Sequence, residues 1–257
     1  MVMANMIFKR VEKKYMISED KLSEMLERMK DIFREDEYGL STISNIYYDT
    51  PNSDLIVRSL EKPAYKEKLR LRVYGNEVND DTKAFIEIKK KYDGVVYKRR
   101  IQHPLGEAVK YLNSRQDIED DSQIKKEIDY FLNFYNVIPK MMIAYDRVAY
   151  VGIQDSSLRM TVDRNIRYRT RDLNLKEGSR GKEILPKGYV LIELKVPVAY
   201  PLEISRILDE LEIYPVSFSK YGRAYMEVIE KRKTQRGRIV AIGNDYSKKE
   251  KKICLQA

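Results

Sequence analysis

Basic and apolar residues alternate along the segment Lys68-Leu69-Arg70-Leu71-Arg72-Val73. Successive side chains of a β-strand point to opposite faces, so the three cations share one face and the three apolar residues share the other. An ordinary half-buried strand carries mixed polar residues on its solvent face, whereas this face is entirely cationic. The alternation therefore predicts a sheet with one apolar face and one face that holds an anion.

Four further segments alternate in the same way, with single carboxylates among the cations: residues 10–14, 86–89, 158–163 and 192–195. Glu12, Glu87 and Glu193 each precede a lysine by two residues, and these lysines are Lys14, Lys89 and Lys195. Each glutamate either pairs with its own lysine or belongs to a set that holds a hard divalent cation, since carboxylate oxygens are suitable ligands for such ions. Asp163 is a further acidic candidate.

Composition restricts the partners and the chemistry. The net charge is +9 over 257 residues, and 35% of the residues are charged against the usual ~25%, which favours an anionic partner such as nucleic acid, a nucleotide, inorganic phosphate or acidic lipid. With one cysteine (Cys254) and one histidine (His103), an internal disulfide is excluded and a zinc site or a Cys/His dyad is disfavoured. A metal site would use oxygen ligands and hold magnesium or manganese.

No apolar run is long enough for a membrane span or a signal peptide, so we expect a cytoplasmic protein.

Hydrophobic periodicity predicts eight strands, at 6–15, 43–48, 66–74, 84–91, 95–101, 141–151, 157–168 and 188–196. Helices are expected from an N-cap at Ser18 to about Arg34, at 105–112, at 124–135, after Pro201 and at 218–231. Strands and helices do not alternate regularly, which favours an antiparallel α+β fold. We expect an eight-stranded antiparallel β-barrel with a charged interior and helices packed outside, as a single domain over 1–230, followed by a basic tail at 231–257.

The cationic face continues at Arg147 and Arg159. Lys220 opens the last predicted helix, and helix N-termini bind phosphate groups. A basic strand face is often only solvated, and a nucleic-acid surface is the other alternative. No nucleic-acid motif, Walker A sequence, GxGxxG or kinase signature is present. Repetition of the pattern on distant strands favours a phosphate-binding interior over these alternatives.

Nine segments occur in the order of a known family: 10–15, 47–51, 67–75, 87–89, 95–100, 145–147, 158–163, 192–195 and 214–221. From Phe8 to Met226 the chain resembles the polyphosphate polymerase domain of the vacuolar transporter chaperone (VTC) family, within the triphosphate tunnel metalloenzyme (CYTH-like) superfamily. The resemblance implies a tunnel that binds ATP or triphosphate and a growing polyphosphate chain, and a metal-dependent transfer of the γ-phosphate onto that chain. One departure is Ser217, where eukaryotic members have a second lysine.

The resemblance and the strand pattern together assign the site residues. The assigned catalytic residues are Arg70, Arg72, Lys89, Arg147 and Arg159. The assigned phosphate-binding residues are Lys14, Lys68, Lys98, Lys195 and Lys220. The assigned ligands of Mn²⁺ or Mg²⁺ are Glu193, Glu12 and Glu87. If water were the acceptor at the same site, the protein would be a triphosphatase. A third hypothesis is a non-catalytic polyphosphate-binding module. Neither nucleic acid nor a membrane is an expected partner.

Overall fold

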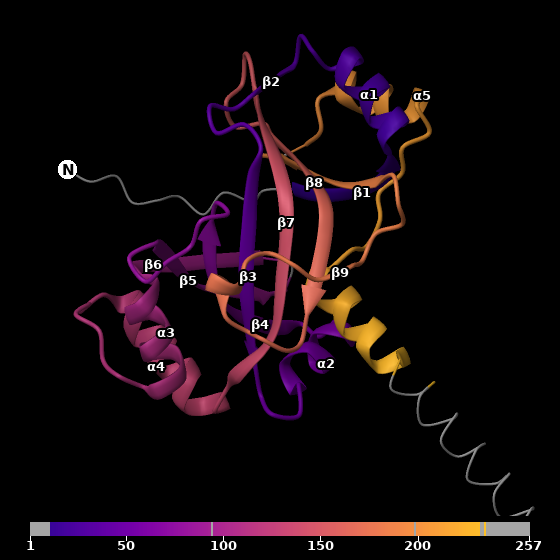
Figure 1. The fold of residues 1–257 in the computed structure, drawn as a ribbon. Coiled ribbons are helices and arrows are strands. Elements are labelled where there is room, and N and C mark those ends of the chain that lie inside the picture. The colour runs from indigo at the N-terminus through magenta and orange to yellow at the C-terminus, as the bar shows by residue number, and fades with distance from the viewer. Residues whose placement is uncertain (1–10, 94, 198, 232–233, 235–257) are drawn as a thin grey trace, which may run out of the picture.

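The computed structural model describes residues 11–93, 95–197, 199–231 and 234. In chain order the elements are β1 (Val11–Ser18), α1 (Glu19–Arg28), β2 (Phe33–Glu35), β3 (Ser41–Asp49), α2 (Asp54–Leu60), β4 (Tyr65–Tyr74), β5 (Lys83–Tyr92), β6 (Val95–Pro104), α3 (Leu105–Ser114), α4 (Gln123–Tyr135), β7 (Ile138–Gly152), β8 (Arg159–Arg169), the 3₁₀ turn η1 (Leu175–Glu177), β9 (Lys182–Glu183), β10 (Tyr189–Val196) and α5 (Leu202–Glu210). Residues 220–231 continue as a C-terminal helix (Figure 1).

All strand pairs in the described ranges are antiparallel and belong to one sheet. Eight strands follow one path, β1-β10-β8-β7-β3-β4-β5-β6, and they correspond to the eight strands predicted from the sequence. The short strands β2 and β9 pair with β7 and β8 outside this path. The antiparallel α+β class is therefore confirmed.

The predicted closed barrel of eight strands is corrected by the structure. The sheet has ten strands, and its two end strands, β1 and β6, do not pair with each other within the described ranges. Instead, the free edge of β1 is covered locally by the C-terminal segment, where the Val216 amide donates to the Lys14 carbonyl over 2.7 Å. The β6 edge carries exposed charged side chains, including Arg99, which is a common protection of a sheet edge.

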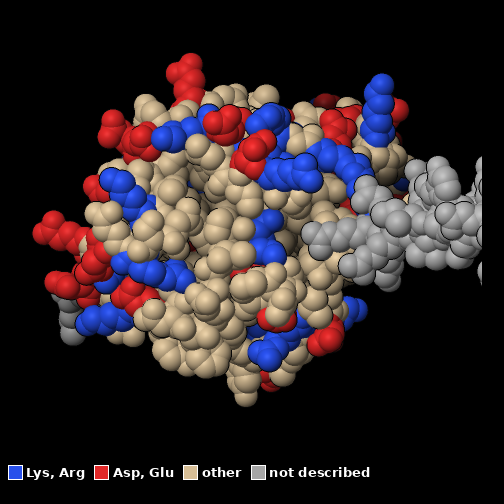
Figure 2. Space-filling view, turned by 60° about the horizontal axis from the view of Figure 1, so that its bottom comes forward, with Lys and Arg blue, Asp and Glu red and all other residues tan. Residues whose placement is uncertain are grey.

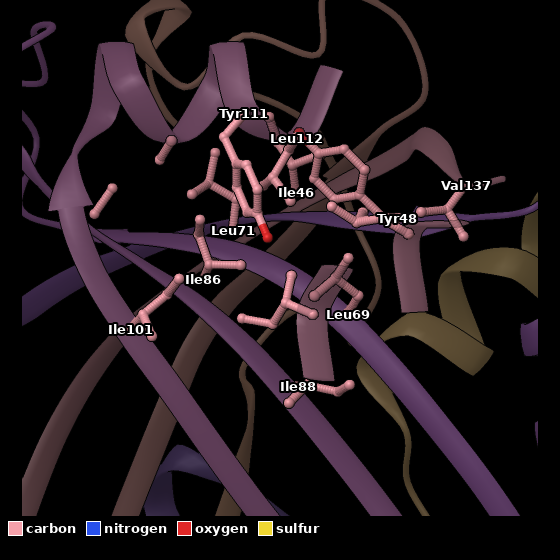
Figure 3. Packing of buried hydrophobic residues seen from close by; sticks show 14 of the residues in the cluster. Ile46, Tyr48, Leu69, Leu71, Ile86, Ile88, Ile101, Tyr111, Leu112 and Val137 are labelled. Carbon is pink, nitrogen blue, oxygen red and sulfur yellow. The ribbon is translucent and has the colours of Figure 1, made fainter. Parts of the chain in front are cut away.

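One apolar face of the sheet packs against α3 and α4. Leu69, Leu71 and Val73 on β4 are fully buried, as the alternation in the sequence predicts. Figure 3 shows Tyr111 and Leu112 of α3 lying over the strands that carry Leu71 and other buried aliphatic residues. Burial of a single aliphatic side chain contributes about 1.5–3 kcal/mol, so this layer is a main source of stability.

The same face of β1, β10 and β8 packs against α1 and α5, which lie side by side at one end of the molecule (Figure 1). Leu22 and Met25 of α1 meet Ile192 of β10 in this core, and Ile204 of α5 joins them. A third apolar cluster lies on the opposite side of the sheet. There Tyr221 and other residues of the C-terminal helix pack against β3, β7 and β8. The C-terminal helix thus occupies part of the face that carries the charges.

The element boundaries differ from the prediction in specific places. The Ser18 hydroxyl caps α1 by accepting from the Lys21 amide, as expected, but α1 ends at Arg28 rather than near Arg34. Phe33 instead starts β2, because residues 33–35 pair with β7. Phe33 is still buried in the same core as α1, which explains why the helical spacing continued past the end of the helix.

A turn at residues 51–52 leads from β3 into α2, a helix that the sequence did not predict. Residues 1–10 and most of the predicted tail at 231–257 lie outside the described residues. None of the helices in the described ranges has the length and apolar character needed to cross a membrane.

Candidate active site

Strand register places the charges of β4, β5 and β6 in rows across one face. Directly opposed residues of neighbouring strands lie on the same face, with Cβ atoms roughly 4.5–5.5 Å apart. The successive rows are Lys68–Lys89–Lys98, Arg70–Glu87–Arg100 and Arg72–Phe85–Gln102. The cations that alternate along the sequence therefore meet cations and one carboxylate from other strands.

Glu87 is the carboxylate at the centre of this half of the site. Its side chain is 1% exposed, and its oxygens lie 2.6 Å from Arg70 Nη2 and 2.8 Å from Lys98 Nζ. Burial alone would raise the pKa of Glu87, but Arg70, Arg72 and Lys98 outweigh it and lower the pKa to about 2. Glu87 is therefore an ionised internal counter-ion that fixes the Arg70 side chain.

Arg72 is held by two uncharged side chains that were not among the predicted site residues. Its guanidinium donates to Asn45 Oδ1 over 2.8 Å and to the Tyr145 hydroxyl over 3.1 Å. The Tyr47 hydroxyl accepts similarly from Arg70 over 3.2 Å. The two-residue period offered a usable signal, because Asn45 and Tyr47 share a face of β3 and Tyr145 lies two residues before Arg147.

A second ionic cluster lies on β7, β8 and the C-terminal helix. Asp163 is completely buried and receives Arg147 through two hydrogen bonds of 2.5 and 2.8 Å. Lys220 Nζ lies 2.5 Å from Asp163 and 4.6 Å from the centre of the Tyr145 ring. Burial opposes the charge of Asp163, yet Lys220 and Arg147 keep its pKa below the usual value. The Asp163 carboxylate thereby orients both cations.

Glu193 connects this cluster to β1. Its oxygens lie 3.3 Å from Lys220 Nζ, 3.6 Å from Lys14 Nζ and 3.6 Å from Lys195 Nζ. Although burial raises the pKa of Glu193, the surrounding lysines and Arg147 hold it well below its ordinary range. Glu12 is more exposed and lies 3.7 Å from Lys14 and 3.9 Å from Lys195.

The sheet curls so that these two halves face one another. Lys14 on β1 donates to the Phe218 carbonyl over 3.0 Å, and Lys68 on β4 donates to the Ser219 hydroxyl over 3.3 Å. Strands that are far apart in the sheet path thus reach consecutive residues of one segment. Figure 2 shows basic side chains in the middle of one face of the molecule, surrounded by uncharged residues.

We call this region the concave charged face. It comprises Glu12, Lys14, Lys68, Arg70, Arg72, Glu87, Lys89, Lys98, Arg147, Arg159, Asp163, Glu193, Lys195 and Lys220. Four residues of this face are exposed: Glu12, Lys89, Lys98 and Arg159. Arg159 shares a row with Lys195 and Glu12 at the rim of this face. The ten cations outnumber the four carboxylates, so the face attracts anions.

Loss of hydration inside this face lowers the pKa of several lysines. Burial lowers the pKa of Lys68 to about 8, and the nearby charges of Lys66, Lys89 and Lys14 act in the same direction. Although part of the Lys89 side chain is exposed, neighbouring protein atoms reduce its hydration and lower its pKa, with Glu12 opposing the shift and Lys14 adding to it. A bound anion would stabilise the protonated, charged form of these poorly hydrated lysines.

The three predicted metal ligands are not brought together. In the part of the chain that the structure describes, no three acidic, histidine or cysteine side chains are grouped so that they could hold a metal ion. Glu87 belongs to the Arg70 cluster, whereas Glu193 and Glu12 both adjoin Lys14 and Lys195. Two carboxylates completed by water and phosphate oxygens suit Mg²⁺, so Glu193 and Glu12 remain the candidate ligands and Glu87 is set apart from them.

Comparison with known proteins identifies the family of this fold and site. A model of the VTC domain matches residues 9–229, which is most of the chain. The chain belongs to the VTC domain family. The family resemblance expected from the ordered sequence segments is thereby confirmed. Most of the described VTC domain, including every residue of the concave charged face, lies within the matched range.

This VTC domain is 26% identical over 159 residues to the vacuolar transporter chaperone complex subunit 4 of Schizosaccharomyces pombe, which covers 53% of this chain and 21% of that protein. The chain thus spans about a fifth of the length of this curated relative. Its fold is similar to the crystal structure of a putative adenylate cyclase from Bacillus halodurans, with a TM-score of 0.51 and 13% identity over 82% of this chain and 93% of that one. At this identity the likeness concerns the fold alone.

Proposed function

We propose that this VTC domain is a metal-dependent polyphosphate polymerase that transfers the γ-phosphate of ATP to a growing polyphosphate chain. Family membership supports a function connected with polyphosphate. The observation that carries the proposal is the concave charged face, on which cations from opposite halves of one sheet converge with a large excess over carboxylates. Such a surface is electrostatically unfavourable until a polyanion neutralises it.

The arginines of this face are prepared to bind phosphate oxygens. A guanidinium group presents its donors in a planar fork that matches phosphate geometry. Arg70 and Arg147 are each oriented by a buried carboxylate, and Arg72 is oriented by Asn45 and Tyr145. Because these side chains are already ordered, little conformational entropy is lost when they bind the triphosphate.

In the proposed reaction, a terminal phosphate oxygen of the chain attacks the γ-phosphorus of ATP. A new P–O bond forms to the chain, the bond to the β–γ bridging oxygen breaks, and ADP leaves with that oxygen. A phosphate oxyanion is itself the nucleophile, so the protein positions the two reactants and stabilises the charge on the transferred group. Arg70, Arg72, Lys89, Arg147 and Arg159 are the proposed catalytic cations.

Lys14, Lys68, Lys98, Lys195 and Lys220 are the proposed phosphate-binding lysines. Lys220 and Lys14 adjoin Glu193, the proposed principal ligand of Mn²⁺ or Mg²⁺, and Glu12 is the second proposed ligand. When bound, such an ion would neutralise phosphate charge as a Lewis acid. We do not retain Glu87 in the proposed metal site, because it belongs to the Arg70 cluster, whereas Glu193 and Glu12 both adjoin Lys14 and Lys195.

Hydrolysis of triphosphate is the second candidate function. It is favoured by the exposure of Lys89, Lys98 and Arg159, because solvent that reaches these residues can supply water as the acceptor. The choice between the two acceptors depends on how well the bound chain excludes water from the γ-phosphate.

The test is incubation of the protein with ATP and Mn²⁺, with and without a short polyphosphate primer. Products are followed by gel electrophoresis and by release of inorganic phosphate. Long chains together with ADP support the polymerase. Free phosphate without chain growth supports the triphosphatase, and tight binding of polyphosphate without turnover supports a binding module and overturns the catalytic proposal.

A further inference from the structure

A further row of opposed lysines lies beyond the concave charged face. Lys66 on β4 is the direct cross-strand partner of Lys91 on β5. Both residues lie two positions along their strands from the Lys68–Lys89 row, so their side chains point to the same side of the sheet. A two-residue step along a strand is about 6.6 Å, which places the new row about 13 Å from the row of Arg70.

Among the described residues, no carboxylate forms an ion pair with Lys66 or Lys91. The nearby ion pairs are made by Lys90, Lys98 and Arg99 instead. Lys66 and Lys91 are half-buried, and Lys62 is exposed beside them. Lys66 Nζ donates to the Ser59 carbonyl over 3.3 Å, and an ammonium group has two further donors. Reduced hydration lowers the pKa of Lys66, and the charges of Lys91 and Lys62 add to the effect.

On the opposite face of this part of the sheet, neighbouring cations do have an acidic partner. Lys90 on β5 lies 3.0 Å from Glu127 of α4, and Arg99 on β6 lies 2.8 Å from the same carboxylate. Lys90 and Arg99 on this outer face, which packs against α3 and α4, are thus paired with a carboxylate, whereas Lys66 and Lys91 oppose each other as like charges. Directly opposed like charges destabilise a sheet, so the row is expected to be neutralised by an external anion.

We propose that Lys66, Lys91 and Lys62 form an outer phosphate subsite that holds the distal part of an inorganic polyphosphate chain. This inference rests on the proposed function and extends it. A chain bound along β4 from Arg72 and Arg70 past Lys68 continues directly onto this row. A ligand of only three phosphates held at Arg70 and Arg72 leaves the outer subsite empty, so the subsite makes affinity depend on chain length.

The test compares binding of tripolyphosphate and of long-chain polyphosphate at one fixed salt concentration, by calorimetry. The variants are Lys66→Ala combined with Lys91→Ala, and Lys90→Ala as a control that removes the same kind of charge from the outer face of β5. We expect the double variant to bind long-chain polyphosphate about tenfold more weakly, which corresponds to 1.4 kcal/mol, with its affinity for tripolyphosphate nearly unchanged. The control variant should retain both affinities.

Thermal melting without ligand verifies that the double variant is folded, and loss of the like-charge pair should leave its melting temperature equal or higher. The outer subsite is overturned if the affinities of the double variant for tripolyphosphate and for long-chain polyphosphate fall by the same factor, or if neither affinity falls. It is also overturned if only the affinity for single-stranded DNA falls in a parallel titration. If the unmutated protein binds tripolyphosphate but shows no preference for long chains, the outer subsite fails while the proposed function survives. Failure of the unmutated protein to bind either ligand overturns both.

Discussion

The Tyr221 hydroxyl donates a hydrogen bond to Asp49 Oδ2 over 2.9 Å, although the two residues are 172 positions apart in the chain. Asp49 is completely buried at the end of β3 and also accepts from the backbone amides of Thr50, Leu55 and Ile56. Tyr221 follows Lys220 directly, and its ring stacks on Tyr47 with 4.7 Å between the ring centres. This contact joins the start of the C-terminal helix to α2 and fixes the position of Lys220.

Replacement of Tyr221 by phenylalanine removes this hydrogen bond and keeps the aromatic packing. We expect the free energy of unfolding to fall by about 1–2 kcal/mol, because a buried carboxylate then lacks one of its donors. Urea denaturation measures the change. Tyr225→Phe is the matched control, since Tyr225 lies on the same helix and packs against the same cluster. Equal losses in the two variants would contradict the role of the Asp49 contact.

Glu87 should contribute to the loss of stability in acid. The folded protein lowers its pKa from 4.5 to about 2, so its stabilising effect is complete above pH 4.5 and disappears as the pH falls from there towards 2. Glu87→Gln should therefore melt at a lower temperature than the unmutated protein at pH 7, and the difference should shrink between pH 4.5 and 2. Melting curves across this range measure it, and a difference that stays constant with pH would refute the assignment.

Binding of triphosphate should weaken as the pH rises through 8. Burial lowers the pKa of Lys68 to about 8 in the unliganded protein, so this lysine loses its charge near that pH, whereas a bound anion favours the protonated form. Calorimetry at pH 7 and pH 9 in constant salt measures the effect. The Lys68→Arg variant keeps its charge at both values and should show a smaller decrease in affinity. An identical pH dependence of the two proteins would exclude Lys68 from binding.

Triphosphate should raise the melting temperature through Arg70 and Arg72. A ligand that binds only the folded state adds about 2.7 kcal/mol at a hundred times its Kd. Arg70→Ala and Arg72→Ala should reduce or abolish the ligand-induced shift, whatever their melting temperatures without ligand. Arg99→Ala is the control, because Arg99 pairs with Glu127 on the outer face. Unchanged shifts in both arginine variants would contradict the site assignment.

Much of this arrangement could be predicted from local sequence patterns. The two-residue period separated buried Leu69 and Leu71 from the cations beside them, because side-chain direction in a strand depends only on position along it. The cap at Ser18 also follows from a local interaction. The end of α1 was not predictable in this way, since the pairing of β2 with β7 sets it.

The partners of each carboxylate depended on the tertiary structure. Glu12 and Glu193 do lie near the lysines two residues further on, but Glu87 pairs with Arg70 and Lys98 from neighbouring strands. Opposed residues of neighbouring strands are closer than residues two apart on one strand, so register decides such pairs. The sequence by itself determined which side chains share a face. The curvature of the sheet and the strand register decided which of them meet, and they left the sheet open between β1 and β6 within the described ranges.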